Sequence, residues 1–175
     1  MNDILRNIRE RRSIRKFKSD MPKKEDLEAI AEAGLFAPSG MNRQGTLILV
    51  ITDKETRDRL SRDNGAVMGR DPNNDPFYGG PAILVVLSNK EYPTYLYDGS
   101  LVMENMLLAA HSLGLGSIWV HRAKEVFELD YWKDFLKKQG IEGDYEGIGN
   151  CVIGYPDGDI PPAKDRLDKR VYWVE

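Results

Sequence analysis

Apolar and polar positions along the chain follow two periods, and each period predicts one kind of element. Apolar residues recur every three or four positions in stretches typical of helices with one buried face: residues 1–10, 22–35 and 123–139. A continuous apolar run at residues 46–52 predicts a buried strand. Further strands are expected at residues 81–87, from residue 118 to 120, and within residues 145–153, where Cys151 has an apolar context. The run at 46–52 is expected to be a central strand. Asp53 follows it and is expected to cap a helix that ends at Leu60.

The most apolar helix is expected over residues 101–113, opened by Asp98 and the two residues after it. Apolar side chains cover most of its circumference, and such a helix must be buried on all sides. It is either a simple core helix or one shared with a second subunit. Asn105 is its polar exception and should have a hydrogen-bonding partner. Residues 63–80, by contrast, are rich in Gly, Pro and Asn, which predicts a long loop or lid.

Composition limits the classes of function. The chain has 175 residues, and we expect a single domain over residues 1–175. The net charge of −3 argues against nucleic acid as a partner, because that function usually needs a basic surface. No apolar run is long enough to cross a bilayer and no signal peptide is visible, so we expect a cytoplasmic protein with no membrane contact. Cys151, the only cysteine, lies among apolar residues, which predicts a buried, inert thiol.

The sequence offers no set of residues for metal or nucleophilic catalysis. It has two histidines and one cysteine, and it lacks H-E-x-x-H, G-x-S-x-G and Walker A elements. No metal site and no catalytic side chain are therefore expected. This absence fits an enzyme whose cofactor performs the chemistry while the protein binds and orients it.

A basic segment, residues 11–17, stands near the start of the chain. In an extended conformation Arg11, Ser13 and Arg15 share one face while Ile14 lies on the other. Three groups that bind anions on one face suit a phosphate. A solvated basic patch is the alternative, but the aliphatic Ile14 and the aromatic Phe17 within the segment favour one that is anchored on a core.

A second polar stretch lies at residues 38–44 and contains Pro38, Ser39 and Asn42. Such residues are ordinary loop formers, so a plain connection is one interpretation. The stretch nevertheless supplies more hydrogen-bond donors than a connection requires.

Taken together, these two stretches resemble the nitroreductase family of FMN-dependent oxidoreductases. Members carry R-R-S-x-R-x-[FY] and, one helix later, A-P-S-x-x-N-x-Q, which match residues 11–17 and 37–44. The family's G-L-G-S-x-W element is matched at residues 114–119. Its late K-x-R element is matched at Lys164 and Arg166, although a solvated tail could also carry that pattern.

The resemblance implies an α+β, nitroreductase-like fold: a central, mainly antiparallel sheet flanked by helices, with a C-terminal segment exchanged between the subunits of a homodimer. Residues 170–175 are too apolar for a free tail and are expected to dock as a strand. The resemblance also implies FMN as the cofactor. Its phosphate would be held by basic and hydroxyl groups: Arg11, Arg12, Ser13, Lys164 and Arg166.

The resemblance places the remaining site residues around the flavin ring. Arg15 would lie near N1 and the C2 carbonyl, where a fixed cation stabilises the reduced ring. The loop with Pro38, Ser39 and Asn42 would come from the partner subunit. The backbone of His121 and Arg122 would contact N5, with no acid–base role for the His121 side chain.

The function implied is hydride transfer from NADH or NADPH through FMN N5 to a nitroaromatic, a quinone or another small planar acceptor, with ping-pong kinetics. Two alternatives stay open. One is a related enzyme that uses reduced flavin for other chemistry, such as flavin reduction or dehalogenation. The other is a non-catalytic, flavin-binding dimer.

Overall fold

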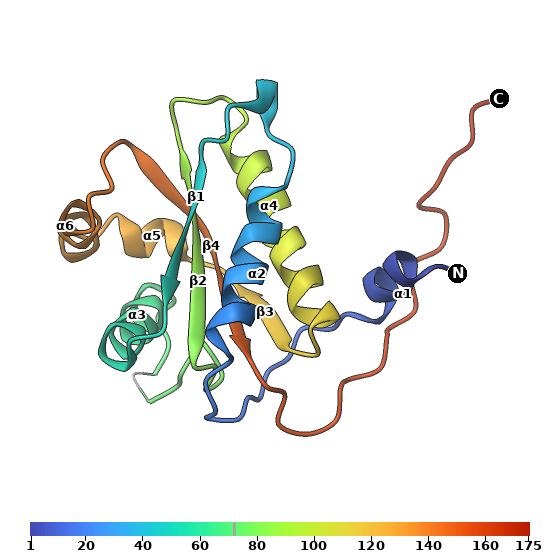
Figure 1. Ribbon diagram of the computed structural model, residues 1–175, viewed down its shortest axis with the longest axis horizontal. Helices are drawn as coiled ribbons and strands as arrows, with labels where there is room; N and C mark the ends of the chain where they lie inside the picture. The colour runs from blue at the N-terminus through green and yellow to red at the C-terminus, as the bar shows by residue number, and fades with distance from the viewer. Residues whose placement is uncertain (72) are drawn as a thin grey trace.

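A sheet of antiparallel strands forms the centre of the molecule (Figure 1). The computed structural model describes residues 1–71 and 73–175, and within them the sheet has four strands in the order β1-β2-β4-β3. Their bounds are Thr46–Ile51 for β1, Ala82–Asn89 for β2, Gly116–Val120 for β3 and Tyr145–Gly154 for β4. The predicted α+β fold with a mainly antiparallel sheet is therefore confirmed.

Helices cover both faces of this sheet (Figure 1). On one side lie α3 (Lys54–Val67), α5 (Ala123–Phe127) and α6 (Asp130–Lys138). On the other lie α2 (Lys24–Leu35) and α4 (Tyr95–Ser112), with α1 (Asp3–Glu10) beside the end of α4. A single 3-10 turn, Gly40–Asn42, precedes β1.

Strand β2 divides the core into two layers because successive side chains of a strand point to opposite faces. Ile83 and Val85 join the cluster of the α3, α5 and α6 side, whereas Leu84 and Val86 join the cluster of the α2 and α4 side. All four side chains are fully buried, which is what a strand paired on both edges and covered on both faces requires. The predicted buried strand is confirmed.

Strand β1 differs from its prediction. It pairs only with β2 and forms one edge of the sheet, so the expectation of a central strand at 46–52 was wrong. Most of its side chains are half-buried, and Ile51 alone is fully buried. The apolar run arises because side chains pack on both faces of the sheet. It does not reveal whether a further strand pairs with the outer edge of β1.

Two helix predictions were also wrong in extent. Helix α3 runs to Val67, so the first residues of the expected loop at 63–80 are helical; Pro72 of that loop lies outside the described residues. The single helix expected over 123–139 is two helices, interrupted where Leu129 adopts an extended conformation before α6. The interruption lets Trp132 fold back against Phe127, with ring centroids 5.2 Å apart.

Helix α4 begins at Tyr95, before the expected start, and is not buried on all sides. Tyr97 and Leu101 are exposed in the single chain, which leaves one apolar side of the helix uncovered. Asn105 has the expected partner, because its Nδ2 donates to the Ala33 carbonyl of α2 at 3.0 Å.

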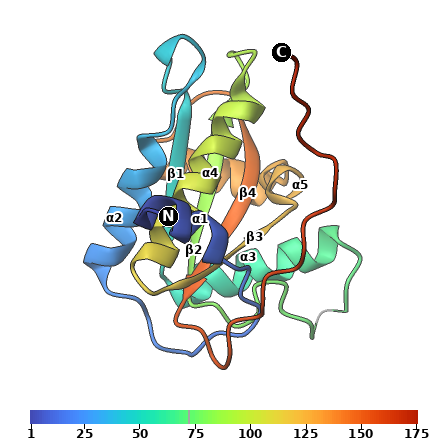
Figure 2. The ribbon, with the colours of Figure 1, turned by 90° about the vertical axis from the view of Figure 1, so that its right-hand side faces the viewer.

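The C-terminal residues extend away from the body of the molecule (Figure 1), and the view turned by 90° shows them passing in front of it (Figure 2). Residues 157–175 form no strand in this chain, and the aromatic side chains of Tyr172 and Trp173 are more than 80% exposed. The expectation that residues 170–175 dock as a strand is therefore not met within one chain. Exchange of this segment between subunits stays a prediction. Among the described residues, none of the helices is both long and apolar enough to span a membrane.

Candidate functional site

The basic segment is anchored on the core, as its apolar residues predicted. Ile14 and Phe17 are buried, at 7% and 8% exposure. The Ile14 N–H donates to the Ser117 carbonyl at the start of β3, at 3.0 Å. The Ile14 side chain packs against Gly116 so closely that a Cβ there would lie 2.9 Å from it. The basic segment is therefore held in a fixed position beside β3.

Arg11 places a charged hydrogen-bond donor in this segment that no acceptor among the described residues satisfies. Its Nη1 atom is buried and has no hydrogen-bonding partner among the described residues. Arg12 differs, because its guanidinium donates to the Arg9 carbonyl at 2.7 Å. A buried guanidinium nitrogen without an acceptor is costly, and an anionic group would satisfy it. The phosphate of FMN thus fits the chemistry of this position.

Two hollows open beside the segment. One of about 90 Å³ is lined by Arg12, Ile14, His111, Gly114, Leu115, Gly116, Ser117, Pro156 and Ile160. The other, of about 340 Å³, is lined by Ser13, Ile14, Arg15, Lys16, Pro156, Asp157, Gly158, Asp159 and Pro161. In the second, Lys16 is paired with Asp157 at 2.7 Å, whereas Ser13 and Arg15 leave their polar groups at its surface.

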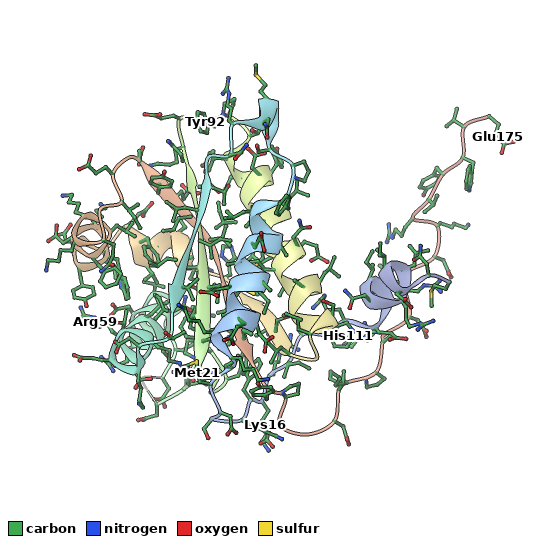
Figure 3. All side chains as sticks on the ribbon, in the orientation of Figure 1. Lys16, Met21, Arg59, Tyr92, His111 and Glu175 are labelled. Atoms are coloured by element: carbon green, nitrogen blue, oxygen red, sulfur yellow. The ribbon has the colours of Figure 1, made fainter. Side chains whose placement is uncertain are left out.

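His111, near the end of α4, is a neighbour of the basic segment that the sequence reasoning missed (Figure 3). Burial lowers the pKa of its imidazole, Glu10 raises that pKa, and the positive charges of Arg11 and Arg12 lower it further, for a net decrease. In the sequence, the only sign of this role is that His111 lies in the last turn of an expected helix. A histidine with a purely structural role would show the same pattern.

The loop at 38–44 is a strained polar structure rather than a plain connection. Met41, Asn42 and Gln44 all have φ between 51° and 54°, a region that residues other than glycine seldom adopt. Side chains hold this shape: Ser39 Oγ accepts a hydrogen bond from the Gln44 N–H at 3.0 Å, and Gln44 Nε2 donates to Asn42 Oδ1 at 3.2 Å. Such strain is typical of functional sites.

Asp98 of α4 also holds the loop at 38–44 in place. The sequence did not identify it as a site residue. It is buried and accepts hydrogen bonds from the Gly40 N–H at 3.1 Å and from the Thr94 hydroxyl at 2.9 Å. The loop and α4 together enclose a hollow of about 260 Å³, lined by Leu35, Ala37, Pro38, Ser39, Gln44, Thr46, Asp98 and Val102.

The loop and the basic segment lie at opposite ends of the sheet in one chain. Ser13 is next to Ser117, which pairs with the same β4 residue as Ala82 of β2, whereas Thr46 after the loop pairs with Ser88. The six residue steps from Ala82 to Ser88 span about 20 Å. Figure 3 shows this separation between Lys16 and Tyr92, whose ring lies under the Arg43 guanidinium of the loop.

His121 and Arg122 form a tight turn between β3 and α5. Arg122 has φ 82°, which is unusual for a residue with a side chain. Its N–H donates to the Nδ1 atom of His121 at 2.7 Å, and its guanidinium pairs with Glu125 at 2.6 Å. The His121 carbonyl accepts a hydrogen bond from Asn64 of α3 at 3.0 Å.

Lys164 and Arg166 are not brought to the basic segment. Both are exposed in the extended C-terminal residues, and across the described ranges neither makes a hydrogen bond or an ion pair. A hollow of about 770 Å³ beside α5 and α6 is lined by no predicted site residue. Two of its lysines are neutralised, Lys90 by Asp144 at 2.8 Å and Lys124 by Glu146 at 3.0 Å. No cluster suited to a metal ion occurs within residues 1–71 and 73–175.

Comparisons with known proteins identify one family. The model of the family described as "Nitroreductase family" matches residues 8–155. A protein of Archaeoglobus fulgidus named "Putative NADH dehydrogenase/NAD(P)H nitroreductase" is 35% identical over 96% of this chain and 95% of its own. A solved nitroreductase with bound FMN from Desulfitobacterium hafniense is 31% identical, with all of both chains covered and a TM-score of 0.87. One from Bacteroides fragilis, 24% identical over all of both chains, shares the fold with a TM-score of 0.88.

Proposed function

Because this chain belongs to the nitroreductase family, we propose that it is an FMN-dependent oxidoreductase that oxidises NADH or NADPH and reduces a nitroaromatic, a quinone or a similar planar acceptor. Bound FMN would supply the hydride chemistry, and one shared stacking position for the two substrates predicts ping-pong kinetics. The single observation that carries the proposal is the buried Nη1 atom of Arg11, which has no partner among the described residues and lies in the segment that resembles the family's phosphate-binding motif.

The phosphate would be held by Arg11, Arg12 and Ser13. Their fixed backbone supports this assignment, since Ile14 anchors the segment to β3. Lys164 and Arg166 remain part of the proposal, and their extended backbone must then turn back toward the segment when the anion binds. Such a site gains its affinity from charge-assisted hydrogen bonds.

The flavin ring would lie between Arg15 and the turn of His121 and Arg122. Arg15 places a positive charge beside the ring, which stabilises negative charge developing there on reduction. The turn would contribute main-chain groups rather than a side-chain acid, because the His121 Nδ1 atom is engaged by its own neighbour's N–H.

We also propose a cytoplasmic homodimer in which two chains complete each site. Pro38, Ser39 and Asn42 lie about 20 Å from the basic segment in one chain, so they reach a flavin only from the partner subunit. The uncovered apolar residues support a large contact between copies: Ile4, Leu5, Ile8, Tyr97, Leu101 and Leu113. The exposed C-terminal segment would then be exchanged between the subunits.

Titration of the purified chain with FMN tests the cofactor, and addition of NADH or NADPH tests the activity. We expect flavin absorbance that is bleached by the nicotinamide and restored by a nitroaromatic or a quinone. Bound flavin that neither nicotinamide bleaches would favour a non-catalytic flavin protein. A chain that takes up no FMN at all would contradict the whole proposal.

Arg11→Ala tests the position of the phosphate. The variant should weaken FMN binding by about 1.5–3 kcal/mol, the usual contribution of hydrogen bonds to charged groups. Arg6→Ala is the matched control, because Arg6 lies on the preceding helix, pairs with Asp3 and is exposed. Equal FMN dissociation constants for Arg11→Ala and the control would refute the placement.

A further inference from the structure

Two buried amide side chains hold the exit of β3. Asn150 of β4 donates from Nδ2 to the Val120 carbonyl at 3.3 Å, and Asn64 of α3 donates to the carbonyl of His121 at 3.0 Å. Both asparagines are fully buried. Consecutive carbonyls at the end of one strand are thus fixed by two elements that are far apart in the sequence.

The turn that these amides hold is strained. Arg122 has φ 82°, and a residue with a side chain persists there only when its surroundings impose the conformation. Two side chains impose it: Asn64 holds the preceding carbonyl, and Glu125 holds the Arg122 guanidinium. The Arg122 carbonyl then accepts from the Val126 N–H at 3.1 Å in the first turn of α5.

Stability alone does not explain these two asparagines. The Oδ1 atoms of Asn64 and Asn150 are buried and have no donor among the described residues. A buried acceptor without a donor costs at least as much as one neutral hydrogen bond contributes. A leucine of similar size at either position would avoid that cost, so the value of the amides lies in the backbone geometry that they impose.

We propose that Asn64 and Asn150 are positioning residues that aim the main chain of His121 and Arg122 at the flavin ring. This inference rests on the proposed function, and it deepens that function by assigning the rate of flavin reduction to two residues that do not touch the flavin. Phosphate binding is separate, because the basic segment is anchored through Ser117 at the other end of β3.

Asn64→Leu and a matched control test this assignment. The control is Asn105→Leu, since Asn105 also donates from a helix to a main-chain carbonyl at 3.0 Å but lies on the opposite face of the sheet. We expect Asn64→Leu to slow flavin reduction at saturating NAD(P)H by about 10- to 100-fold, as small misplacements of reacting groups do. FMN affinity and melting temperature should change no more than in the control.

Asn64→Asp provides a second readout that a purely structural role would not move. A protonated carboxyl can donate to the His121 carbonyl, whereas an ionised one cannot, and burial raises the pKa of such a carboxyl. Flavin reduction by this variant should therefore be near normal at low pH and fall as the pH rises. A pH profile parallel to that of the unaltered chain would contradict the proposal.

Amide hydrogen exchange on the FMN-free chain separates this inference from the proposed function. Asn64→Leu should speed exchange at His121 and Arg122, and Asn105→Leu should not. If the unaltered chain binds no FMN, the proposed function fails and the exchange result still decides whether Asn64 positions the turn. Unchanged exchange in Asn64→Leu, or an equal loss of reduction rate in both leucine variants, overturns the inference.

Discussion

Asp75 closes the connection between α3 and β2, and its replacement by alanine should destabilise the protein. Its carboxylate accepts four hydrogen bonds: from Arg57 Nη2 at 2.6 Å, Ser61 Oγ at 2.6 Å, Phe77 N at 2.9 Å and Gly79 N at 2.8 Å. Arg57 is almost buried and also donates to the Gly80 carbonyl at 3.0 Å. One carboxylate thus fixes the loop that contains the fully buried Phe77.

The magnitude follows from the loss of one partner of a partly buried ion pair. Removing one member of a fully buried pair costs about 3–5 kcal/mol. The Asp75 side chain is 33% exposed, and Arg57 keeps Asp58 and the Gly80 carbonyl as acceptors. We therefore expect Asp75→Ala to lower the free energy of unfolding by about 2–4 kcal/mol after allowance for solvent screening.

Urea unfolding measures this change as a shift of the midpoint with an unchanged slope. Asp58→Ala is the control, because Asp58 contacts Arg57 at 3.2 Å and the exposed Lys54 from the surface of α3. Such a surface pair should contribute less than about 1 kcal/mol. If Asp75→Ala costs no more than Asp58→Ala, the carboxylate does not hold the loop.

The pH dependence of the Asp75 contribution has a defined sign. Burial raises the pKa of this carboxyl, but the hydrogen bonds from Arg57, Ser61, Phe77 and Gly79 lower it by more, so the net pKa lies below its usual value of 3.8. The ionised form is therefore favoured by folding. Its stabilisation is complete above about pH 5 and is lost as the pH falls through the lowered pKa, where the stabilities of wild type and Asp75→Ala should converge.

Two further outcomes test the surroundings of the site. Burial, the main cause, lowers the pKa of His111 below 6.5, so the unfolded chain binds a proton at this residue before the folded chain does, and stability should fall as the pH drops below about 6.5. His111→Asn should make this fall in the urea midpoint smaller. A fall of unchanged size would mean that another group causes it. Burial raises the pKa of Cys151 to about 12, so the folded protein should not react with thiol reagents at pH 8 and should react in urea; labelling of the native chain would contradict the burial.

The elements that the sequence predicted best are those buried on both faces. Strand β2 packs against apolar clusters on both faces, so its continuous hydrophobic run identifies it, whereas in β4 only Cys151 to Ile153 form such a run. The position of β1 at the edge was not predictable in this way, because pairing uses main-chain groups that all residues share. The interruption at Leu129 was missed for a related reason, since neither glycine nor proline marks it and the helical pattern continues on both sides.

In the candidate site, local backbone motifs were predictable and distant supports were not. Ile14 and Phe17 indicated an anchored segment, and the structure confirms that anchoring. Asp98 and Asn64 act on loops far away in the sequence, so no spacing rule could link them to those loops. Asn150, a polar residue within an apolar strand, is a visible signal that the sequence reasoning passed over.

The sheet order has a consequence for how the protein reaches its working form. The central pair of strands joins Asn89 to Tyr145, so residues 90–144 must form a closed loop before the two strands can pair. Pairings between such distant segments make folding slow. The basic segment (residues 11–17) takes its final position later still, because the Ile14 N–H donates to the Ser117 carbonyl and Phe17 forms a bridge with Pro156. During synthesis on the ribosome the basic segment is made well before Ser117 and Pro156, so it cannot reach its final place until these later residues have emerged.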